Sequence, residues 1–143
     1  MIKLLDILKE SAEPNIFYFA YGSNMEHKRM KHRCPDAVKY SDGVLFGWKR
    51  EVNEKGVDTI VRGESSDDHV EGVVWLISKS DVETLDKREG VKIGDYIKRH
   101  LEVDTPGEDK ICLVYITTNS KPGTAKANYK RIVKKGEEEN KIR

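Results

Sequence analysis

The stretch from Ile16 to Met25, IFYFAYGSNM, decides how the start of the chain folds. Its first six residues form a continuous apolar and aromatic run, which predicts a buried strand. Gly22 would let the backbone turn sharply, and Ser23 or Asn24 could cap a helix over residues 24–34. The backbone amides at such a junction attract an anion, which could be a carboxylate, a phosphate or a developing oxyanion. The alternative is a plain strand-to-helix turn.

Strands are also predicted in the middle of the chain, over residues 37–52, 57–63, 69–77, 95–103 and 110–118. These segments are rich in β-branched and aromatic residues and are separated by turn residues. Gly43 and Gly47 interrupt the first of them, which indicates bulges or sharp bends in a curled sheet.

Helices are predicted over residues 2–10, 78–90 and 124–143. In the middle helix, Ser80 and Glu83 have the spacing of a capping box, and Gly90 suits the position just past its end. Together the elements predict an α+β fold with a curved, mainly antiparallel mixed β-sheet or small barrel flanked by short helices.

Length and composition suit a single domain over residues 1–143, with residues 1–14 as a helical N-terminal extension. Charged residues make up 36% of the chain, yet the net charge is only +1, from 26 Lys and Arg against 25 Asp and Glu. No stretch approaches the roughly 18 to 20 apolar residues of a membrane span, and the N-terminus lacks the apolar core of a signal peptide. We therefore expect a cytoplasmic protein, with Cys34 and Cys112 as ordinary thiols.

Glu89 is a candidate general base, because it ends the helix predicted over residues 78–90. The partial negative charge of a helix C-terminus raises a carboxyl pKa, and desolvation would add to this effect. The alternative is an exposed glutamate at a helix end. Ser23 lacks the G-x-S-x-G spacing of a hydrolase nucleophile, and the four histidines lack the spacing of metal ligands, so no metal site is expected.

Five segments in order, YFAYGSNM, EGVVW, LDKREGVKIGDY, YITTN and NYKRIVKKGEEEN, resemble the γ-glutamylcyclotransferase family, also described as AIG2-like. The resemblance runs from Phe17 to Asn140. It implies a barrel-like sheet flanked by helices, with a pocket between the YGSN segment and an acid. Enzymes of this family cleave γ-glutamyl compounds by cyclisation, releasing 5-oxoproline and a free amine, without a metal or cofactor.

The resemblance also implies roles for individual residues. Glu89 would be the catalytic general acid and base. The predicted substrate-binding residues are Tyr18, Tyr21, Gly22, Ser23, Asn24, Tyr96, Tyr115 and Tyr129. For the tyrosines, the alternative is simple packing in the core or sheet.

The expected function is cyclisation of a γ-glutamyl amino acid, peptide or amine. One alternative is a family member that removes a γ-glutamyl protecting group in a biosynthetic pathway. Another is a non-catalytic domain that binds a small ligand or a polyanion, because residues 121–143 hold eight Lys and Arg against three Glu. We expect a small-molecule substrate, no nucleic-acid or membrane partner, and a chain that could form a homodimer.

Overall fold

The computed structural model describes residues 13–89, 94–118 and 127–140, with the side chains of 127–130 left aside. The helix predicted over residues 2–10 and the role given to Gly90 lie outside these residues. No helix in the described part of the chain is long and apolar enough to cross a membrane.

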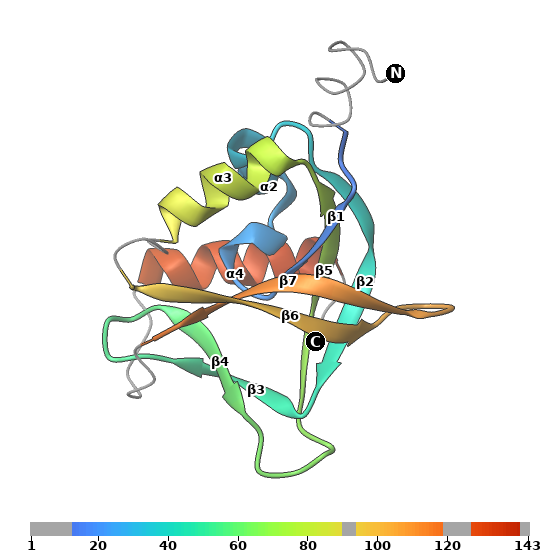
Figure 1. Ribbon diagram of the computed structural model, residues 1–143. Coiled ribbons are helices and arrows are strands. Elements are labelled where there is room, and N and C mark those ends of the chain that lie inside the picture. The colour runs from blue at the N-terminus through green and yellow to red at the C-terminus, as the bar shows by residue number, and fades with distance from the viewer. Residues whose placement is uncertain (1–12, 90–93, 119–126, 141–143) are drawn as a thin grey trace.

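Five strands form a closed barrel in the order β1-β5-β2-β6-β7. Their bounds are Ile16–Ala20 for β1, His69–Ile77 for β5, Val38–Phe46 for β2, Tyr96–Asp104 for β6 and Asp109–Thr117 for β7. All neighbours are antiparallel except β1 and β7, which run parallel and close the barrel where Tyr18 pairs with Leu113. The predicted mixed, mainly antiparallel barrel is therefore confirmed (Figure 1).

Two further strands, β3 (Trp48–Val52) and β4 (Asp58–Arg62), form a separate antiparallel hairpin beside the barrel. The chain leaves the barrel at Gly47, whose φ of 84° lies in the region that favours glycine. The backbone N–H of Thr117 at the end of β7 donates to the Thr59 hydroxyl at 3.2 Å. This bond fixes the hairpin against the end of the barrel.

Helices α3 (Lys79–Arg88) and α4 (Ala127–Glu139) and the shorter α2 (His27–Arg33) pack around one side of the barrel (Figure 1). The capping box of α3 begins two residues before the predicted one. Ser78 accepts a hydrogen bond from the Asp81 backbone, and the Asp81 carboxylate accepts one from the Ser78 backbone. Ser80 and Glu83 fit the same pattern, but strand β5 ends at Ile77, so the helix starts earlier.

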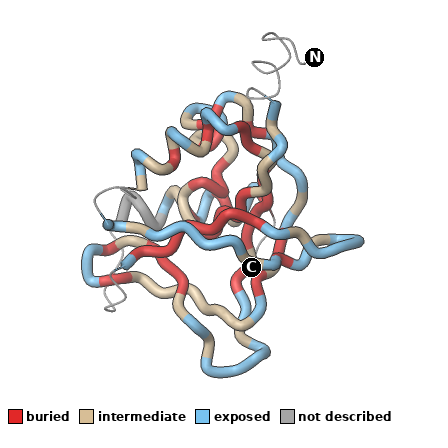
Figure 2. Tube along the Cα trace, in the orientation of Figure 1, coloured by how far each residue is buried: buried red, intermediate tan, exposed pale blue. Residues whose placement is uncertain are grey.

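Buried residues lie along the barrel strands and beneath the helices, while the tips of the hairpins are exposed (Figure 2). Gly43 and Gly72 pair across β2 and β5. A Cβ atom at Gly72 would lie 2.4 Å from the Ala20 carbonyl oxygen, and one at Gly43 would lie 2.8 Å from Val74. The irregularity in β2 falls between Lys39 and Ser41, so Gly43, one of the glycines for which a bulge or a sharp bend was predicted, pairs without a bulge. Close packing inside the barrel requires glycine there.

Candidate active site

The YGSN segment forms the turn at the end of β1. Residues Ser23–Met25 make a single 3-10 turn, η1, closed by a 3.1 Å bond from the Met25 N–H to the Gly22 carbonyl. The indole N–H of Trp75 donates to the Asn24 carbonyl at 3.1 Å and holds the turn against β5. Gly22 has a φ of −117°, so this turn does not depend on the left-handed conformation.

Neither Ser23 nor Asn24 caps the next helix, contrary to the prediction. Because the 3-10 turn intervenes, Glu26 occupies the N-cap position of α2, without a capping side-chain bond. The buried Asn24 side chain contacts other residues instead. Its amide nitrogen donates to the Tyr18 hydroxyl at 3.0 Å, and its amide oxygen accepts from the Arg33 guanidinium at 2.7 Å. Asn24 therefore joins β1 to α2.

Glu89 follows the last residue of α3, and its backbone N–H donates to the Leu85 carbonyl at 2.8 Å. The residue is half-buried. Burial raises the pKa of the Glu89 carboxyl above its ordinary value, while the positive charge of Arg33 acts in the opposite direction. The raised pKa was predicted, but burial is its largest cause here.

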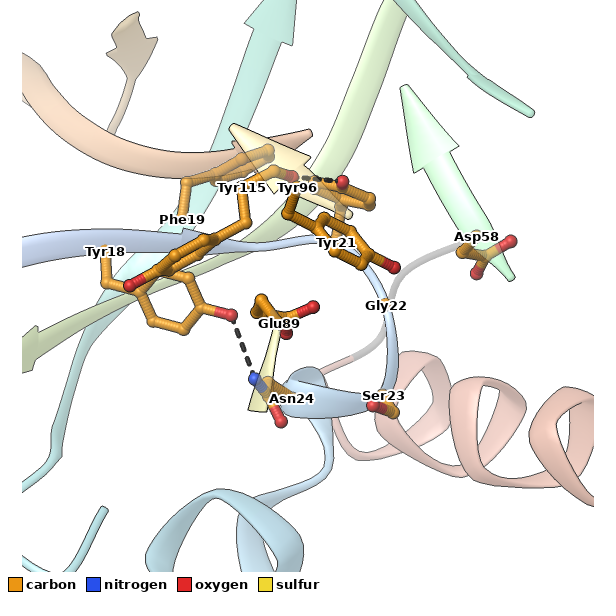
Figure 3. Close-up of a pocket in the computed structure, with 10 residues that line it drawn as sticks. All are labelled: Tyr18, Phe19, Tyr21, Gly22, Ser23, Asn24, Asp58, Glu89, Tyr96 and Tyr115. Atoms are coloured by element: carbon orange, nitrogen blue, oxygen red, sulfur yellow. Dashed lines mark hydrogen bonds between the residues drawn. The ribbon is translucent and has the colours of Figure 1, made fainter. Parts of the chain in front are cut away.

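A cavity of about 40 Å³ lies between the YGSN segment and Glu89 (Figure 3). Its lining brings together all the predicted site residues except Tyr129, whose side chain is among those not described. The lining consists of Tyr18, Phe19, Tyr21, Gly22, Ser23, Asn24, Asp58, Glu89, Tyr96 and Tyr115. These residues come from β1, η1, β4, β6, β7 and the end of α3, so the cavity exists only in the folded chain.

Three of the tyrosines are fixed in the cavity wall. The Tyr21 hydroxyl donates to the Tyr115 carbonyl, and the Tyr115 hydroxyl donates to the Asp86 carboxylate at 2.6 Å. Burial, together with the negative charge of Glu89, raises the pKa of Tyr18. The phenols therefore stay neutral near pH 7 and offer hydrogen bonds without charge.

Two charged residues at the site were not predicted. Asp58 lines the cavity and pairs with Arg50 at 2.6 Å. Arg33 holds Asn24 and acts electrostatically on Glu89. No local pattern marks either residue, because Asp58 of β4 and Arg33 of α2 are brought to this site by the tertiary fold. Cys34, which was expected to be an ordinary thiol, is fully buried in the core, where burial raises the pKa of its thiol to about 12.

The cavity in this small barrel combines a half-buried carboxyl group, a backbone turn and neutral phenols, which are groups that can bind a small polar molecule and exchange a proton with it. A family described as AIG2-like matches residues 69–143. A γ-glutamylcyclotransferase of Bos taurus is 36% identical over 94% of this chain and 76% of its own length. The Homo sapiens γ-glutamylcyclotransferase is 34% identical over 90% of this chain and 73% of its own length.

A solved structure described as γ-glutamyl cyclotransferase superposes with a TM-score of 0.81 at 33% identity, covering 89% of this chain and 80% of its own. The chain belongs to the γ-glutamylcyclotransferase family, and it is an enzyme of that class. The fold and the resemblance predicted from the sequence are both confirmed.

Proposed function

We propose that this enzyme cyclises the γ-glutamyl group of its substrate to 5-oxoproline and releases a free amine, with Glu89 as general acid and base. The names of the curated relatives support the activity. The position of Glu89 in one cavity with the YGSN segment supports the assignment of the proton-transfer residue.

The reaction needs a base because the α-ammonium group of the substrate is not a nucleophile. Glu89 takes one proton from it, and the resulting amine attacks the γ-carbonyl carbon. The protonated Glu89 gives its proton to the leaving nitrogen, and the bond from carbon to that nitrogen breaks. The attacking nitrogen still carries two protons, and it passes one of them through the Glu89 carboxylate to the released amine, which leaves as an ammonium group. No water or external reactant is consumed, and the carboxylate is regenerated.

The other groups of the cavity bind and orient. The backbone amides of Gly22 and Ser23 can hold either the α-carboxylate or the oxygen that gains charge in the intermediate. The rigid wall of neutral tyrosines favours a folded glutamyl chain, and bringing amine and carbonyl together accounts for much of the acceleration of an intramolecular reaction.

The main support for this proposal is that Glu89 and the YGSN segment line the same cavity. The variant Glu89→Gln tests it. We expect 5-oxoproline release from a γ-glutamyl dipeptide, measured by mass spectrometry, to fall at least about 100-fold, as loss of a general base typically causes. The matched control is Glu83→Gln, which alters an exposed glutamate of the same helix. An undiminished rate in Glu89→Gln would refute the assigned role.

A further inference from the structure

A second cavity of about 120 Å³ lies next to the first and has three times its volume. It is lined by Asn53, Lys55, Val57, Asp95, Tyr96, Thr117 and Thr118. Tyr96 lines both cavities, and Val57 of the second precedes Asp58 of the first in the chain. The two cavities are therefore neighbours, separated by the start of β4 and the Tyr96 side chain.

The wall formed by the β3–β4 hairpin is well fixed. The buried Asn53 side chain accepts hydrogen bonds from the backbone N–H groups of Lys55, at 3.0 Å, and Val57, at 3.1 Å. The Asn53 N–H donates to the Val57 carbonyl at 2.9 Å, and the Gly56 N–H donates to the Asn53 carbonyl at 2.9 Å. The hairpin turn thus presents Lys55 to the cavity from a defined backbone.

The second cavity is lined by two side chains of opposite charge, Lys55 and Asp95, and both are exposed. Among the described residues, no carboxylate lies within 4 Å of the Lys55 ammonium group. Elsewhere in the lining, the Thr118 hydroxyl donates to the Gly94 carbonyl at 2.7 Å. A free amino acid carries one ammonium and one carboxylate group, so this pair of charges is complementary to it.

We propose that the second cavity is the subsite for the leaving group, and that Lys55 selects leaving groups with a free carboxylate. This inference rests on the proposed function. The γ-glutamyl group would occupy the first cavity, and the chain beyond the scissile bond would pass Tyr96 into the second. In the intact substrate the leaving nitrogen is an uncharged amide, so the carboxylate is the charge that Lys55 recognises. Asp95 faces the ammonium group that appears after cleavage.

A matched pair of substrates tests the subsite: γ-glutamylalanine, which has a carboxylate, and γ-glutamylalaninamide, in which a neutral amide replaces it. We expect Lys55→Ala to raise KM for γ-glutamylalanine about 5-fold, as loss of a partly exposed charge pair does, with kcat little changed. KM for the amide should stay the same, and Lys55→Arg should restore most of the preference. The control is Lys49→Ala, at the other end of β3, where Lys49 pairs with Glu64 at 3.4 Å.

Binding to the Glu89→Gln variant, measured by calorimetry, separates the subsite from the chemistry. If Lys55→Ala in this background weakens binding of γ-glutamylalanine alone, the subsite holds, even if the wild-type chain releases no 5-oxoproline and the proposed function fails. Equal effects on both compounds, or an effect on neither, would overturn the subsite whether or not the enzyme turns over.

Discussion

Glu89 is half-buried and is the proposed general base, so its protonation should change the reaction rate with pH. Burial raises the pKa of its carboxyl group, and a general base works only when deprotonated. We expect kcat/KM to fall as the pH drops, with a midpoint above the ordinary glutamate value of about 4.3. A pH profile of 5-oxoproline release measures this midpoint. A midpoint at or below the ordinary value would mean that the carboxyl group is not desolvated in the free enzyme.

The same raised pKa should cost the folded protein stability. Folded Glu89 holds its proton more tightly than the unfolded chain does, so its ionisation at rising pH weakens the fold. Glu89→Gln removes that penalty, and we expect its Tm at pH 7 to exceed the wild-type value by about 2 °C. The difference should vanish below the ordinary glutamate pKa. Thermal unfolding of both proteins at pH 7 and at low pH measures it, and a lower Tm for the variant at pH 7 would contradict the argument.

At the scale of elements, Gly72 shows how tightly the barrel is packed. A Cβ atom there would lie 2.4 Å from the Ala20 carbonyl and 2.8 Å from the Phe19 ring. Because this carbonyl belongs to the backbone of β1, a side chain cannot rotate out of the way. We expect Gly72→Ala to lower the free energy of unfolding by about 2–3 kcal/mol, measured by urea denaturation.

The control for this substitution is Glu71→Ala, at the neighbouring half-exposed position of β5, which should change stability by less than about 0.5 kcal/mol. Equal losses in the two variants would indicate that strand propensity, rather than contact with β1, explains the effect.

The strands were predictable because their signals are local. Strand β5 has the bounds that its apolar run predicts, His69–Ile77, and β1 ends one residue before its predicted end. The cap of α3 was not predictable at this level. Both Ser78 with Asp81 and Ser80 with Glu83 satisfy the capping pattern, and the end of β5 selects the first pair. Patterns of one segment cannot show where its neighbour stops.

At the scale of the whole molecule, the site depends on contacts between segments that are far apart in the sequence. The sequence singled out Glu89 and the YGSN segment as candidates, from their local patterns and from the family resemblance, and the structure places them around one cavity. The sequence pattern did not identify Asp58, which lines the cavity, or Arg33, which contacts the lining residue Asn24, because only the tertiary fold places them there. The separation of the β3–β4 hairpin from the barrel was also not predictable from the sequence, because the apolar pattern of the hairpin resembles that of the barrel strands.

Asn140, just after α4, connects this last helix to segments from the first part of the chain. Its buried amide nitrogen donates to the carbonyls of Met25, at 3.1 Å, and Gly136, at 2.6 Å. Its amide oxygen meets the His27 ring at 3.0 Å and the Lys39 ammonium group at 2.5 Å. One side chain thus connects α4 to the turn that borders the cavity, to α2 and to the barrel.

We therefore expect Asn140→Ala to destabilise the protein by about 1–3 kcal/mol, because it leaves the buried Met25 carbonyl without this donor. Hydrogen exchange should accelerate most in residues 22–27, with amides of β5 changing only through the global loss of stability. Release of 5-oxoproline should slow, since the YGSN turn loses its anchor. Glu138→Ala, an exposed change near the end of the same helix, is the control. Uniform acceleration of exchange along the chain would instead mean that Asn140 supports the whole fold and does not position the active-site turn.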